Sequence, residues 1–186
     1  MISVFYLIYI IWVSSEILIN RLLLSGATDK KNMDGNTLRI IWITIAVATT
    51  VAVTISNLIY LPIFHGAIVR YIGLGLILLG CLLRFLTIRS LGREFTADVT
   101  IRTDHRLKTD GIYSYLRHPS YSCSVLSFIG FGLSLNNWVS LIILVVSVVA
   151  VFLKRISVEE KALTAQFGPA YSEYKSKTRK LIPFIW

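Results

Sequence analysis

Long apolar stretches separated by short polar segments make up most of this chain. A helix that crosses the hydrocarbon core of a bilayer needs about 20 predominantly apolar residues. The apolar residues fall into five runs, at residues 2–24, 38–64, 67–88, 121–135 and 138–153. The pattern therefore predicts an all-α, polytopic integral membrane protein with about five transmembrane helices.

The first and fourth runs need separate interpretation. The first lacks a basic leader and a small-residue cleavage site, so we interpret it as a retained span and not as a signal peptide. The fourth is short for a full crossing. Asn136 and Asn137 predict a tight turn after it, so runs four and five form a C-terminal helical hairpin. A re-entrant pair that does not cross the bilayer is the alternative.

The composition agrees with a membrane protein and excludes several soluble classes. Hydrophobic residues make up 55% of the chain and charged residues 16%, whereas a soluble domain is about one quarter charged. This balance argues against a soluble enzyme or a nucleic-acid-binding module. With 186 residues, the chain predicts one membrane domain, 1–186, in which 1–88 holds three spans and 89–186 holds the hairpin and the larger polar segments.

The basic residues predict the orientation in the membrane. Segments 21–39, 89–117 and 154–180 hold 17 of the 19 lysines and arginines. Lysine and arginine crowd cytoplasmic loops, so these three segments are expected in the cytosol, with the N-terminus on the opposite side. The net charge of +9 then reflects topology, and nucleic acid is not expected as a partner. The membrane is the plasma membrane in a prokaryote or the endoplasmic reticulum in a eukaryote.

Two ionisable residues lie inside predicted spans. Glu16 falls in the first run and Arg84 in the third, each several residues from the cytosolic end. Ionisable groups at such depth are costly and usually pair or face a cavity. One interpretation is a Glu16–Arg84 ion pair, and the alternative is an arginine that extends alone to the headgroups.

The densest polar chemistry lies in residues 104–121. Asp110-Gly111 is a turn signal, and Pro119 is a favoured first residue for the helix that follows. The N-terminus of that helix presents free N–H groups that suit an anionic group of a ligand. An ordinary loop at the membrane surface is the alternative.

A second polar cluster follows the last apolar run. Arg155 and Glu159 are four residues apart and share a helix face, which also fits a surface salt bridge. Pro169 ends that helix. Tyr171 and Tyr174 then place two rings on one side of the next turn, as a lid or, more simply, as an anchor at the membrane surface.

No phosphate-binding loop or dinucleotide fingerprint is present, and His65, His105 and His118 lack the spacing of metal ligands, so no metal site is expected.

Both clusters together, over roughly residues 92–185, resemble the isoprenylcysteine carboxyl methyltransferase family. The motifs that carry the resemblance are Gly111-Ile112-Tyr113, Arg117-His118-Pro119-Ser120-Tyr121, Arg155 with Glu159-Glu160, Phe167-Gly168-x-x-Tyr171-x-x-Tyr174-Lys175 and Pro183-Phe184-Ile185. Their order, with a hairpin-length apolar stretch between the second and third, is more specific than any one motif.

The resemblance implies a membrane methyltransferase that uses S-adenosyl-L-methionine, with 89–186 as its catalytic region. The residues that match the family's cofactor site are His105, Arg106, Leu107, Lys108, Tyr113, His118, Pro119, Ser120, Tyr121 and Glu159. Arg155 matches the family's substrate-binding arginine, and we expect it to act in catalysis by gripping a carboxylate.

The implied reaction is methyl transfer to the C-terminal carboxylate of a prenylated cysteine, with the lipidic substrate entering from the bilayer. Three alternatives stay open: a phospholipid amine or thiol as acceptor, an NADPH-dependent membrane reductase, and a non-enzymatic membrane adaptor or channel. The oligomeric state is left open.

Overall fold

The computed structural model describes residues 2–22, 36–94 and 106–182. Within these ranges the chain is helical, as the apolar runs predict. The helices are α1 (Ile2–Leu22), α2 (Thr37–Leu58), α3 (Ile68–Leu91), the short 3₁₀ turns η1 (Gly92–Glu94) and η2 (Gly111–Ser114), α4 (Pro119–Leu135), α5 (Trp138–Phe167) and α6 (Pro169–Lys177). Predicted site residue His105 and the motif at 183–185 lie outside the described residues.

Three of these helices are long and apolar enough to cross a membrane: α2, α3 and α5. Helices α1 and α4 are apolar over shorter stretches, Val4–Ile19 and Pro119–Leu135. The chain is therefore an all-α membrane protein with three candidate spans, and the prediction of about five crossings stays a prediction for α1 and α4.

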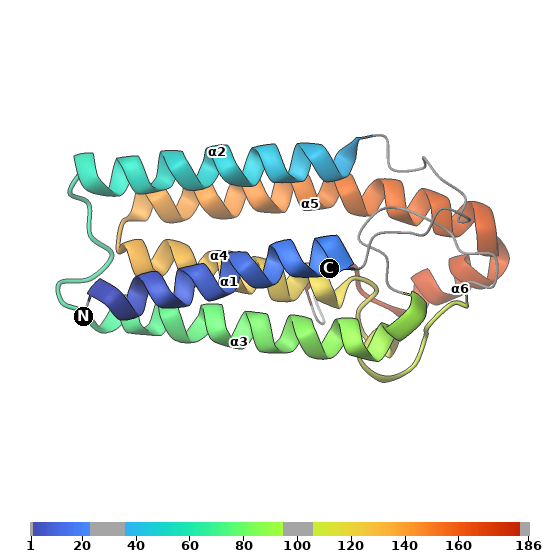
Figure 1. The fold of residues 1–186 in the computed structure, drawn as a ribbon. Helices are drawn as coiled ribbons and strands as arrows, with labels where there is room; N and C mark the ends of the chain where they lie inside the picture. The colour runs from blue at the N-terminus through green and yellow to red at the C-terminus, as the bar shows by residue number, and fades with distance from the viewer. Residues whose placement is uncertain (1, 23–35, 95–105, 183–186) are drawn as a thin grey trace.

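The helices form two layers (Figure 1). Helix α2 packs along α5, whereas α3 packs along α4, with α1 beside them. Helices α1, α3 and α5 run in one direction, and α2 and α4 run in the other. The polar parts of the chain therefore gather at one end of the bundle, where η2, α6 and the last turns of α5 lie.

Close backbone contact holds α3 against α4. A Cβ atom built on Gly73 of α3 would lie 2.5 Å from the carbonyl oxygen of Gly130 on α4, and one built on Gly130 would lie 2.6 Å from the carbonyl oxygen of Gly73. No side chain fits in that space. Small residues allow such approach, and in lipid this packing replaces the hydrophobic effect as the force between helices.

The predicted hairpin is present, and its turn also shortens the second predicted span. Asn136 adopts a left-handed conformation, with φ of 52°, and its amide binds the backbone of Ile63 and Phe64 at 2.9–3.2 Å. The run 38–64 was expected to be helical nearly to its end. The helix instead stops at Leu58, because the following backbone groups bond to Asn136 and to Asn137, whose Nδ2 donates to Ile59 O at 2.7 Å.

Candidate functional site

A cavity of about 560 Å³ opens between the two layers. Its walls come from helices α1 to α6, from the turns η1 and η2, and from the segment that precedes η2. The half at the polar end of the bundle is lined by hydroxyl and charged groups. The half inside the bundle is apolar, with Trp12, Ile41, Trp42, Phe128, Phe131 and Phe152 in its walls.

The cavity brings together most of the residues that the family resemblance singled out. Those that line it are Arg106, Leu107, Lys108, Tyr113, His118, Pro119, Ser120, Tyr121, Arg155 and Glu159. They come from two stretches that are far apart in the sequence. The fold thus brings these residues to one cavity. The role of each residue stays a prediction.

Glu159 lies over the start of α4. The Tyr121 hydroxyl donates to Glu159 Oε2 at 3.1 Å, and His118 Nδ1 lies 3.9 Å from Glu159 Oε1. His118 precedes α4, and Pro119 occupies its first turn, as predicted. The carboxylate therefore faces a helix N-terminus, where free N–H groups favour negative charge.

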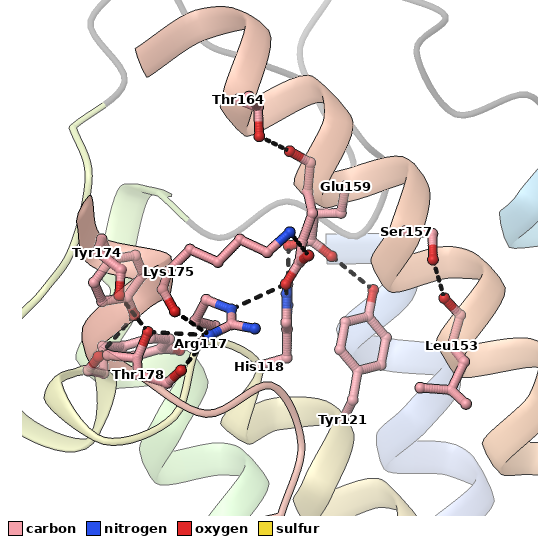
Figure 2. A network of polar contacts seen from close by, with 12 residues as sticks. Arg117, His118, Tyr121, Leu153, Ser157, Glu159, Thr164, Tyr174, Lys175 and Thr178 are labelled. Carbon is pink, nitrogen blue, oxygen red and sulfur yellow. Dashed lines mark hydrogen bonds and ion pairs between the residues drawn. The ribbon is translucent and has the colours of Figure 1, made fainter. Parts of the chain in front are cut away.

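Glu160 connects three elements. Its partners Arg117, His118 and Lys175 point toward α5 from the start of α4 and from α6 (Figure 2). Arg117 Nε donates to Glu160 Oε1 at 3.0 Å, and His118 Nε2 lies 3.3 Å from the same oxygen. Lys175 of α6 approaches Glu160 Oε2 at 3.0 Å. Glu160 is only 6% exposed, so this buried carboxylate ties α5 and α6 to the start of α4.

Arg155 is almost fully buried, at 2% exposure. Its Nη1 donates to the Thr37 hydroxyl at the start of α2, at 2.6 Å. Thr37 is an anchor for this guanidinium that no sequence pattern indicated. Arg155 lies one turn before Glu159 on the same cavity wall.

The C-terminal segment is held alongside the start of α4. Arg117 N donates to Arg179 O at 2.8 Å, His118 N donates to Lys180 O at 3.2 Å, and Arg179 N donates to Tyr115 O at 2.9 Å. The Arg117 guanidinium also donates to Lys175 O at 3.0 Å. Arg117 belongs to one of the motifs that carry the family resemblance. Its contacts with the C-terminal segment were not predicted.

The interpretation of Tyr171 and Tyr174 as a membrane-surface anchor is wrong. Both rings are buried, at 1% and 8% exposure, and both line the cavity. The Tyr174 hydroxyl donates to Tyr113 O at 2.7 Å, and burial raises the pKa of Tyr174 to about 12. Because α6 folds back onto α5, its tyrosines face the protein and not lipid.

The hydroxyl of Tyr171 is buried without a hydrogen-bond partner. Burial, followed by the nearby charges of Glu160 and Glu159, raises the pKa of Tyr171 above its ordinary value, so the hydroxyl is protonated. An unsatisfied buried hydroxyl costs about 1–3 kcal/mol. A ligand in the cavity that offered it a polar atom would relieve that cost.

Glu16 and Arg84 form the ion pair that was one of two interpretations of their positions. Arg84 Nη2 lies 3.3 Å from Glu16 Oε2, and both side chains line the cavity. Arg84 Nη1 also donates to Ser120 O at 3.2 Å and to the Ser124 hydroxyl. The arginine therefore supports the first turn of α4 from behind and does not extend alone to the headgroups.

A family model decides the classification. The model described as phospholipid methyltransferase matches residues 68–170. The chain belongs to this family. The match runs from α3 to the beginning of α6, so it includes both polar clusters of the cavity.

The curated relatives of this chain carry a more specific name. Protein-S-isoprenylcysteine O-methyltransferase B of Arabidopsis thaliana is 39% identical over 115 residues, which cover 61% of this chain and 58% of the relative. Protein-S-isoprenylcysteine O-methyltransferase of Schizosaccharomyces pombe is 37% identical over 114 residues, which cover 60% of this chain and 48% of the relative. The chain thus spans about half the length of the curated relatives it matches. The resemblance to isoprenylcysteine carboxyl methyltransferases is confirmed.

A solved structure shares the architecture. The eukaryotic intramembrane Ras methyltransferase, isoprenylcysteine carboxyl methyltransferase, superposes with a TM-score of 0.65 at 29% identity, covering 77% of this chain and 52% of that one. This likeness supports the membrane character that the apolar helices indicate.

Proposed function

We propose that this protein transfers a methyl group from S-adenosyl-L-methionine to the C-terminal carboxylate of a prenylated cysteine. The observation that carries the proposal is one cavity whose walls combine charged and hydroxyl groups with large apolar side chains, and which Arg155 also lines. The family and the names of its relatives support the same reaction. Both reactants, one water-soluble and one lipidic, would find a matching half.

The polar half suits the proposed cofactor chemically. S-adenosyl-L-methionine carries an ammonium group, a carboxylate and ribose hydroxyls, and it supplies an activated methyl group on a sulfonium. Glu159 can accept from an ammonium or a hydroxyl, and the start of α4 can receive a carboxylate. The unpartnered Tyr171 hydroxyl offers a further polar contact. Arg106, Leu107, Lys108, Tyr113 and the residues 118–121 would complete this binding site.

The chain's own residues would act by positioning and by excluding water. An α-carboxyl group titrates near pH about 3.5, so a prenylcysteine carboxylate is already ionised and needs no general base. Arg155 would hold that carboxylate through its fork of donors, with Thr37 fixing the guanidinium. Tight positioning of two reactants in a water-poor site can supply much of a rate enhancement.

Arg155 favours a carboxylate as acceptor over an amine. A cationic side chain would repel a phospholipid ammonium group, and an amine or thiol would need an acidic partner or a base in that position. In the proposed topology the polar end of the bundle faces the cytosol, from which the cofactor enters, and the lipid tail enters from the bilayer between helices.

Calorimetric titration of the detergent-purified protein with S-adenosylhomocysteine, with NADPH titrated in parallel, tests the cofactor. We expect S-adenosylhomocysteine alone to bind. Methylation of a farnesylated cysteine, with a phospholipid amine and a small thiol as competing acceptors, then tests the substrate. Binding of NADPH alone would support a reductase, and binding of neither by folded protein would support a non-enzymatic role.

A further inference from the structure

The apolar half of the cavity ends at one level in the bundle. The innermost lining residues are Tyr9 on α1, Thr50 on α2 and Phe131 on α4. Each lies about a dozen residues from the polar end of its helix, which corresponds to roughly 20 Å at 1.5 Å per residue. On three separate helices, therefore, the cavity lining reaches a similar depth.

Tyr9 is held firmly at this inner end. Its hydroxyl and the Ser134 hydroxyl on α4 are 2.7 Å apart, and Ser134 Oγ donates in turn to Phe131 O at 2.6 Å. The Tyr9 ring packs edge-on against the Phe131 ring, with centroids 5.0 Å apart. A ring fixed at two points cannot turn aside cheaply to admit a longer ligand.

The next residue on the same face of α1 confirms that the cavity stops here. Phe5, one turn beyond Tyr9, packs against the core and against Tyr71 of α3, with ring centroids 5.8 Å apart. It is absent from the cavity wall among the described residues. The Tyr9 side chain thus separates the apolar cavity from a filled core.

We infer that Tyr9 sets the upper limit on the length of the isoprenoid chain that the acceptor carries. The inference rests on the proposed function and deepens it, because it names a residue that determines the specificity for the lipid. The prenyl chain lies along the apolar walls with its far end against the Tyr9 ring. Farnesyl and geranylgeranyl groups, the two prenyl groups that proteins carry, differ by one isoprene unit at that end.

The experiment compares kcat/KM for farnesylated and geranylgeranylated cysteine acceptors in the full-length protein. Replacing Tyr9 with Ala removes the ring, so we expect the geranylgeranyl-to-farnesyl ratio to rise at least about tenfold, since pocket volume discriminates at this scale. Replacing Tyr9 with Trp enlarges the ring and should lower the same ratio. The two variants shift the ratio in opposite directions, which a general loss of stability would not do.

Two controls separate ring volume from other effects. Tyr9→Phe keeps the ring but removes its hydroxyl contact with Ser134, so its ratio should lie between those of the wild type and Tyr9→Ala. Tyr6→Ala removes a tyrosine from the same helix that is 61% exposed, and its ratio should also be unchanged.

The possible failures are distinguishable. If the wild type methylates neither acceptor, the proposed function is wrong. If both acceptors are methylated and neither Tyr9→Ala nor Tyr9→Trp changes the ratio of their kcat/KM values, the inference about Tyr9 is wrong. The prenyl group then leaves the cavity sideways into the bilayer.

Discussion

The carboxylate of Glu16 on α1 and the guanidinium of Arg84 on α3 lie 3.3 Å apart in the wall of the cavity. This pair links a helix that has limited contact with the bundle to the helix that supports the start of α4. Arg84 reaches α4 through Ser120 and Ser124. The ion pair therefore connects α1 to the backbone of the predicted cofactor site.

Replacing Glu16 or Arg84 alone should destabilise the protein by more than half of what replacing both residues does. Glu16→Gln leaves a half-buried guanidinium without this counter-charge, and Arg84→Met leaves a half-buried carboxylate without this cation. Removal of one partner from a fully buried pair costs about 3–5 kcal/mol, which is the upper bound for this pair. Thermal unfolding in detergent should show that the double variant Glu16→Gln/Arg84→Met loses clearly less than the sum of the two single losses. Strictly additive losses would contradict the coupling.

Glu159 and Arg155 should affect different steps of the proposed reaction. Glu159 contacts Tyr121 at the start of α4, so Glu159→Ala should weaken S-adenosylhomocysteine binding. Arg155→Ala should abolish turnover while largely keeping that binding, because in the proposed reaction Arg155 holds the acceptor carboxylate. Calorimetry and a methylation assay on the same preparations measure both quantities. An equal loss of cofactor binding in both variants would contradict this division of roles.

Glu160 should matter far more for the docking of α6 than Glu173, a carboxylate on α6 itself. Glu160→Gln weakens contacts to Arg117, His118 and Lys175 at once, so the C-terminal segment should become a protease target and the melting temperature should fall. Glu173→Gln breaks only a surface pair with Lys177 and should change neither result. Limited proteolysis and thermal unfolding provide the comparison. Equal protease sensitivity and equal melting temperatures in the two variants would contradict the role of Glu160 in holding α6.

A methyl group in the α3–α4 interface should separate the two helices. Gly73→Ala places a Cβ 2.5 Å from backbone atoms of α4, and overpacking of this kind costs about 1–3 kcal/mol or more. Gly75→Ala, on the same helix with nothing within 4 Å, is the matched control and should be neutral or slightly stabilising. Chemical denaturation in detergent should separate the two variants, and similar midpoints would refute close contact.

Tyr174 should make the folded state sensitive to strongly alkaline pH. A tyrosine hydroxyl has a pKa of about 10 in an unfolded chain, and burial raises the pKa of Tyr174 to about 12 in the folded one. The folded state therefore holds this proton more tightly, so its stabilising effect is complete below pH 10 and is lost as the pH rises to 12. Melting temperatures across this range should fall less steeply for Tyr174→Phe, and parallel curves would exclude a contribution from Tyr174.

Much of this protein follows from local sequence patterns. Long apolar runs can satisfy their backbone groups in lipid only as helices, so the helical class and the hairpin turn at Asn136 are encoded locally. The motif around Pro119 predicts a helix start because proline fits the first turn of a helix. Arg155 and Glu159 share a helix face through their spacing alone.

Contacts between distant segments required the tertiary structure. The similar depth of Glu16 and Arg84 left two interpretations open, and the structure decided for the ion pair. No spacing along the chain indicated the Thr37 anchor of Arg155 or the burial of Tyr171. The same holds for the early end of α2, which depends on Asn136 binding Ile63 and Phe64. Helical periodicity determines which face of a helix is apolar, whereas the partner of each face depends on how all the helices pack together.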